Sequence, residues 1–86
     1  MLELIYTPSV VKEFIKLETN LKEEVLEKIE FFKNPKNHKQ LKVHKLKGPM
    51  KNRYSFSVNY KTRVIFEYLS KDEVIFHAVG DHAIYK

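Results

Sequence analysis

The first part of the chain has the hydrophobic spacing of a short strand followed by a helix. Apolar and polar side chains alternate over Leu2–Tyr6, which predicts a strand. Thr7 can cap the helix that follows, and Pro8 suits its first position because the missing N–H would have no partner there. We expect this helix to end near Glu18. Its buried face is predicted to consist of Val10, Val11, Phe14, Ile15 and Leu17.

A second amphipathic helix follows after only a residue or two. Asn20 and Glu23 have the spacing of a capping box, and the residue before Pro35 resists helical angles, so we expect a helix from Asn20 to about Asn34. The short connection predicts an antiparallel helical hairpin. The buried face of the second helix is predicted to consist of Leu21, Val25, Leu26, Ile29 and Phe32.

The second half of the chain has the period-two alternation of strands. It is clearest over Tyr54–Tyr60, continues in the largely apolar Arg63–Leu69, and recurs over Glu73–Val79. Leu41–His44 alternates weakly. We therefore expect one α+β domain over residues 1–86, in the order β-α-α-β-β-β, with a four-stranded, antiparallel-dominated sheet and the two-helix hairpin on one face.

The same alternation separates an apolar face of the sheet from a polar one. Tyr54 and Tyr60 fall on the apolar side with Phe56, so we expect both in the core and not stacked on a nucleobase. His77 stands between apolar neighbours and is expected to pack in the sheet. The core is predicted to include Val25, Ile29, Phe56, Val64, Phe66 and Phe76.

Composition excludes several classes of protein. Hydrophobic residues make up 43% of the chain, too many for a disordered protein, and the absence of cysteine excludes disulfides and thiolate metal sites. No apolar run approaches the roughly 18 residues of a membrane helix, and the N-terminus lacks the pattern of a signal peptide. We therefore expect a cytoplasmic protein without a membrane segment.

Charge is strongly segregated along the chain. No Asp or Glu occurs between Phe31 and Phe66, whereas the rest of the chain has 6 basic and 11 acidic residues, a net charge of −5. Such asymmetry predicts a surface that binds a polyanion. The acid-free stretch contains ten basic residues: Lys33, Lys36, Lys39, Lys42, Lys45, Lys47, Lys51, Arg53, Lys61 and Arg63.

The basic half offers chemistry suited to RNA cleavage without a metal. His38 and His44 have no carboxylate nearby in the sequence, so a zinc site is not expected, and His38 is expected to be exposed in a loop. When a 2′-hydroxyl attacks the adjacent phosphate, the enzyme must supply a base, an acid and cations for the developing charge. Histidine suits both proton roles, and Lys and Arg suit the charge role.

Four segments taken in order resemble a known family. They are His44–Gly48, Arg53–Tyr60, Arg63–Phe66 and Gly80–Tyr85. Together with the predicted order of elements, they resemble the RelE/ParE toxin superfamily, and most closely its YafQ/YoeB-like branch. The resemblance implies the toxin of a type II toxin–antitoxin system, a ribosome-dependent messenger RNA endoribonuclease that inhibits translation.

The resemblance also implies roles for individual residues. His44 is the candidate base, His82 the general acid, Arg63 the contact to the scissile phosphate, and Tyr85 the residue that orients the nucleotide. Ser57 departs from the family pattern, because several relatives have Arg or His there. The residues expected to bind RNA are Lys42, Lys45, Lys47, Lys51, Arg53 and Lys61.

The expected partners are a cognate antitoxin, messenger RNA in the ribosomal A site, and ribosomal RNA, with no cofactor. Two other functions stay open. A ParE-like gyrase poison would share the fold without cutting RNA. A non-catalytic RNA-binding module would be expected to have stacking aromatics among its exposed basic residues.

Overall fold

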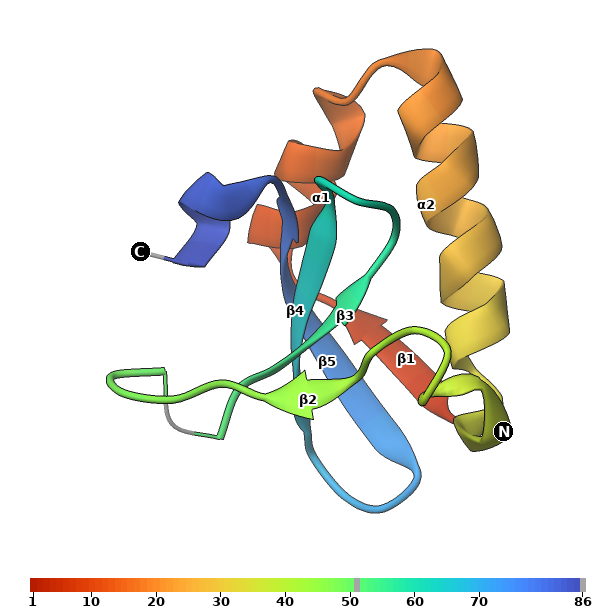
Figure 1. Ribbon diagram of the computed structural model, residues 1–86, viewed down its shortest axis with the longest axis vertical. Coiled ribbons are helices and arrows are strands. Elements are labelled where there is room, and N and C mark those ends of the chain that lie inside the picture. The colour runs from red at the N-terminus through yellow and green to blue at the C-terminus, as the bar shows by residue number, and fades with distance from the viewer. Residues whose placement is uncertain (51, 86) are drawn as a thin grey trace.

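The computed structural model describes residues 1–50 and 52–85, without the side chains of His82 and Tyr85. In this part of the chain a helical hairpin packs on a five-stranded sheet of order β1-β5-β4-β3-β2 (Figure 1). No described helix is long and apolar enough to span a membrane. The elements are β1 (Glu3–Tyr6), α1 (Pro8–Ile15), α2 (Thr19–Phe32), η1 (Pro35–Asn37), β2 (His44–Lys45), β3 (Tyr54–Ser57), β4 (Arg63–Tyr68), β5 (Glu73–Gly80) and η2 (His82–Tyr85).

The predicted α+β class, the antiparallel-dominated sheet and the placement of both helices on one face are confirmed. The expected four strands are one too few, because a two-residue edge strand, β2, begins at His44, the last residue of the weakly alternating segment. β1 pairs in parallel with β5, and the other pairs are antiparallel. Thr7 closes this parallel pair while it caps α1: its Oγ1 accepts from the N–H of Val10 at 3.1 Å and donates to the carbonyl of Phe76 at 2.9 Å.

The helix boundaries differ from those expected. α1 ends at Ile15, and α2 begins at Thr19 with Glu18 as an N-cap that makes no side-chain hydrogen bond. The predicted capping box of Asn20 and Glu23 is therefore wrong. Glu18 is extended, with φ −68° and ψ 158°, so the reversal between the helices occurs before Asn20, which lies inside the first turn of α2.

The buried stripes of the helices are narrower than the spacing predicted. Val11, Ile15 and Leu26 are 43%, 61% and 53% exposed. The hairpin buries only the residues that point straight at the sheet, and its outer apolar residues remain at the surface. Val11 and Leu26 line an apolar pocket between the helices and the sheet.

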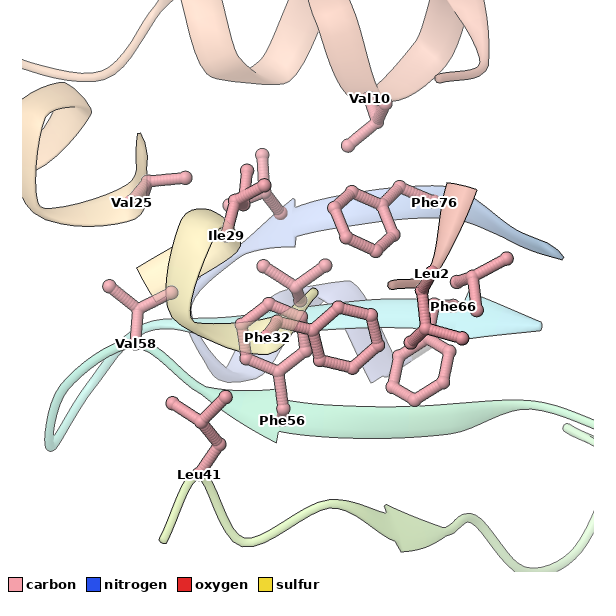
Figure 2. Close-up of a cluster of buried hydrophobic side chains, with 13 residues drawn as sticks. Leu2, Val10, Val25, Ile29, Phe32, Leu41, Phe56, Val58, Phe66 and Phe76 are labelled. Atoms are coloured by element: carbon pink, nitrogen blue, oxygen red, sulfur yellow. The ribbon is translucent and has the colours of Figure 1, made fainter. Parts of the chain in front are cut away.

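The core lies between the hairpin and the sheet and is built around aromatic rings (Figure 2). Phe32 of α2 is fully buried, and its ring lies 4.6 Å from that of Phe56, 4.9 Å from Phe66 and 5.6 Å from Phe76, measured between centroids. Such contacts add to the hydrophobic gain from burial. All six predicted core residues are buried, so that prediction is confirmed: Val25, Ile29, Phe56, Val64, Phe66 and Phe76.

The two tyrosines expected in the core behave differently. Tyr54 is half-buried and stacks on Phe66 at 5.6 Å, as expected. Tyr60 is 93% exposed, so the prediction that it lies in the core is wrong. β3 ends at Ser57, and the chain turns into the loop to β4 before the alternation reaches Tyr60.

Candidate functional site

The sheet presents one face to the helices and another, which we call the open face, away from them. Alternation places the residues between the buried phenylalanines and valines on the open face. Ser57 pairs with Arg63, and Arg63 with Gly80, so these positions form a row across three strands. Ser55 and Ile65 form the next row and are 0% and 1% exposed, although neither belongs to the core cluster under the helices. The centre of the open face is therefore covered, and polar side chains surround it.

His44 extends the second row onto the edge strand. It pairs with Ser55 and so lies on the open face, where it is exposed. Its Nδ1 lies 2.9 Å from the carbonyl oxygen of Lys42, a residue whose left-handed backbone, with φ of 59°, is uncommon outside glycine. Because a carbonyl can only accept, this hydrogen bond requires the proton on Nδ1. Nε2 of neutral His44 then has the lone pair that a proton acceptor needs.

Arg63 begins β4, and its guanidinium turns back toward the loop before it. Nη1 donates to the carbonyls of Asn59 at 2.7 Å, Tyr60 at 3.2 Å and Thr62 at 3.3 Å. Within the described residues, no hydrogen bond uses Nε or Nη2. Two adjacent N–H groups of arginine can bind a phosphate bidentately. The loop therefore orients the side chain and leaves one such edge available.

A single side chain organises this loop between β3 and β4. Asn59 Oδ1 accepts from the N–H groups of Lys61 at 2.9 Å and Thr62 at 2.8 Å. Its Nδ2 donates to Oε1 of Glu24 on α2 at 2.7 Å. Thr62 is buried, at 4% exposure. The carbonyls that hold Arg63 are thus tied to the sheet and to the helical hairpin.

The C-terminal turn η2 folds back toward the same row. Gly80 faces the open side, and a Cβ atom there would lie 2.7 Å from Cγ2 of Ile84, so only glycine allows this close approach. Asp81 caps η2 by accepting from the N–H of Ala83 at 3.0 Å. The backbones of His82 and Tyr85 therefore lie in a turn that starts beside Arg63. Their side chains lie outside the described part of the structure.

A cluster that the sequence did not predict lies at the other end of the open face. Oε1 of Glu67 is 3.0 Å from Nε2 of His77 and 3.7 Å from Nε of Arg53. His77 lies in β5 and is half-buried, as expected of a residue that packs in the sheet, but its carboxylate partner was not expected. A register shift pairs Ile65 with Ala78 and Phe66 with Phe76, so His77 is the extra residue of a β-bulge and faces Glu67. Only the outward position of Glu67 could be inferred from alternation.

The other predicted residues are dispersed. Lys42, Lys47 and Lys61 are exposed, and Lys61 lies in the loop between β3 and β4. Lys45 pairs with Tyr54 and so points to the opposite face from His44. Lys51 lies outside the described residues. Within the described part of the chain, two of the ten basic residues pair with carboxylates outside the acid-free stretch: Lys33 Nζ lies 2.6 Å from Oε2 of Glu30, and Arg53 Nε lies 3.7 Å from Oε1 of Glu67.

His38 does not have the exposed position expected of it. Its ring is half-buried, stacks on Phe32 at 4.4 Å, and places Nε2 2.8 Å from the carbonyl of Phe32. His38 therefore belongs to the packing of the core. Among the described residues, no three His, Cys, Asp or Glu side chains gather in a way that could hold a metal ion.

No family model and no curated protein matches the sequence. Solved structures do match. A copper-bound mutant toxin from Helicobacter pylori is 25% identical, with a TM-score of 0.74 and 100% coverage of both chains. A YafQ mutant from Escherichia coli is 18% identical, with a TM-score of 0.72 over 99% of this chain and 98% of that one. The RelBE2 toxin–antitoxin complex from Mycobacterium tuberculosis is 14% identical, with a TM-score of 0.72 over 94% and 98%.

The chain has the RelE-like toxin fold. This confirms the resemblance to RelE and YafQ-type toxins inferred from the four sequence segments. Within the RelE-like fold, the open face brings His44, Ser57 and Arg63 together with the backbone turn that carries His82 and Tyr85.

Proposed function

We propose that this protein is the toxin of a type II toxin–antitoxin pair, a cytoplasmic endoribonuclease that cuts messenger RNA in the ribosomal A site. Because one fold can support different activities, the proposal depends on the site. Its main support is the arrangement of Arg63 and His44, which offer a phosphate-binding edge and a proton-accepting nitrogen on the same face. Sheet spacing puts their Cα atoms roughly 12 Å apart.

The chemistry follows from these positions. Nε2 of His44 takes the proton from the 2′-hydroxyl as its oxygen attacks the adjacent phosphorus, and Arg63 stabilises the negative charge of the phosphorane. The bond to the 5′-oxygen then breaks, leaving a 2′,3′-cyclic phosphate and a 5′-hydroxyl. In this proposal, His82 protonates the leaving 5′-oxygen and Tyr85 orients the nucleotide, as the family resemblance implies.

Ser57 takes a smaller part in this scheme. It lies beside Arg63 in the same row, where relatives have Arg or His. A hydroxyl is not a base near neutral pH, but it can donate a hydrogen bond to a phosphate oxygen. We therefore assign Ser57 to binding and the proton transfer to His44.

The exposed basic residues support the two proposed macromolecular partners. Lys42, Lys47 and Lys61 would bind neighbouring phosphates of messenger RNA and ribosomal RNA, and an acidic segment of a cognate antitoxin would cover the same surface. Each phosphate neutralised on single-stranded RNA should contribute about −0.7 to the slope of log K against log salt concentration.

The test compares His44→Ala and Arg63→Lys with Lys39→Ala, a change at an exposed position of the same basic segment. Cleavage is read from 5′ ends of cellular messages and from a purified ribosome–messenger complex. General acid–base groups typically contribute about 10²–10⁴-fold, so His44→Ala should lose that much activity while it keeps its fold and antitoxin binding. His38→Ala is not a suitable control, since His38 packs on Phe32.

Two outcomes would contradict the proposal. Full cleavage by His44→Ala would remove His44 as the base. Growth arrest that persists without RNA cleavage in a His44, His82 double variant would favour the gyrase-poison alternative instead.

A further inference from the structure

We propose that Tyr60 is a base-stacking residue that binds the unpaired RNA base next to the phosphate held by Arg63. This inference rests on RNA as the substrate of the proposed function, but it does not require that the RNA be cleaved. It adds a stacking subsite for a neighbouring nucleobase to the proposed site, in which Tyr85 orients the nucleotide that is cut and the other assigned side chains act on the phosphate, the 2′-hydroxyl and the 5′-oxygen.

The exposure of Tyr60 is the first observation. Its side chain is 93% exposed, and no described aromatic ring contacts it. Single exposed apolar residues are common on protein surfaces, so exposure alone does not indicate a function. What distinguishes Tyr60 is the loop that carries it.

That loop is held by several hydrogen bonds and is joined directly to Arg63. The carbonyl oxygen of Tyr60 itself accepts a hydrogen bond from Arg63 Nη1 at 3.2 Å. Asn59, which precedes Tyr60, accepts hydrogen bonds from the backbone N–H groups of Lys61 and Thr62, which follow it. Asn59 also donates a hydrogen bond to Glu24 of α2. The backbone of Tyr60 is therefore fixed relative to the guanidinium before any ligand binds. An aromatic ring on an ordered backbone costs little conformational entropy on binding.

The charges around the loop define the side from which RNA can approach. Tyr60 and Lys61 line a shallow depression between the loop and the start of α2, together with Glu18 and Glu24. The two carboxylates disfavour a phosphate inside this depression, so the RNA backbone is expected on the Arg63 side of the loop. Lys61 follows Tyr60 and is exposed, and Arg63 lies two residues further along the chain. A strand that passes over these two cations would have its base beside the Tyr60 ring. Proteins that bind single-stranded RNA combine aromatic stacking with basic residues in this way.

The experiment measures binding of a single-stranded 2′-fluoro RNA, which lacks the attacking hydroxyl, to the full chain and to Tyr60→Ala, Tyr60→Leu and Tyr60→Phe. Stacking on one base predicts roughly 5- to 150-fold weaker binding by the Ala variant. The Leu variant should lose most of the affinity, whereas the Phe variant should retain it. The salt slope should stay unchanged in Tyr60→Ala, but should shrink by about 0.7 in Lys61→Ala, which loses a phosphate contact.

A scan of the same RNA with single abasic positions locates the base. One position should weaken binding by the unaltered chain and have no effect on Tyr60→Ala. The inference is overturned if Tyr60→Ala binds RNA as tightly as the unaltered chain does. It is also overturned if Tyr60→Ala loses binding to the antitoxin but keeps its binding to RNA. If Tyr60 affects RNA binding but the chain cuts no natural RNA, the inference stands and the proposed function fails. If the chain cuts RNA and the Tyr60 variants bind and cut it equally well, the proposed function stands and the inference about Tyr60 fails.

Discussion

The two faces of the sheet use the same strands for opposite purposes. On the helix face, Phe56, Phe66 and Phe76 form a buried cluster with Phe32 of α2. On the open face, the neighbouring positions carry Arg63 and other polar residues that bond to loop carbonyls and to one another. Adjacent residues of one strand therefore contribute to different properties. Substitutions one position apart should separate stability from RNA binding.

The largest effect on stability should come from the helix face. Phe66 is fully buried among three other phenylalanine rings. Phe66→Ala leaves a cavity and should lower the free energy of unfolding by roughly 3–5 kcal/mol, measured by urea denaturation. For a domain of 86 residues this is a large part of the total. The matched change Tyr60→Ala should stay within about 0.5 kcal/mol. A cost for Phe66→Ala no larger than that would contradict this division between the faces.

The loop that positions Arg63 should show an intermediate effect. Asn59→Ala removes the acceptor for two backbone N–H groups, one of them on buried Thr62, and should cost roughly 1–3 kcal/mol. It should also lower RNA cleavage, because the carbonyls that orient Arg63 lose their support.

A double-mutant cycle can separate the two ends of the Asn59 side chain. Asn59→Asp retains the oxygen acceptor but faces the carboxylate of Glu24, so it should also destabilise the fold. Glu24→Gln should relieve this repulsion. Measured unfolding free energies that add without coupling would show that the contact between Asn59 and Glu24 does not hold the loop to α2.

The general architecture was predictable because its signals are local and repeated. Helical spacing and strand alternation each extend over several residues, so the predicted core does not depend on any one position. The start of α2 is a different case, because Glu18 caps it only through the backbone and leaves no sequence signature. The strand β2 has two residues, too few for alternation to indicate.

The site was less predictable because its decisive features interrupt these patterns. The alternation of β3 pointed to a buried Tyr60, but the side-chain bonds of Asn59 turn the backbone before that residue. Likewise, the β-bulge in β5 rotates His77 toward Glu67. A bulge adds one residue without a reliable signal in a single sequence. The positions of His44 and Arg63 could be anticipated only from the order of the matching segments.

The smallest predicted effect concerns the rim of the helix face at alkaline pH. Burial, and secondly the nearby Tyr54, raise the pKa of Tyr68 above its usual value of 10.0. Because the folded state holds this proton more tightly than the unfolded state does, the contribution is fully present below pH 10.0 and is lost as the pH rises through the folded pKa. The unfolding free energy should therefore decline above that pH, and Tyr68→Phe should make the decline shallower. Tyr6, whose pKa is also raised mainly by burial, should account for part of the decline that is left in Tyr68→Phe. Urea denaturation at several alkaline pH values measures the decline, and absorbance of tyrosinate confirms the ionisation. If the Tyr68→Phe, Tyr6→Phe double variant declined as steeply as the unaltered chain, the loss would come from other groups.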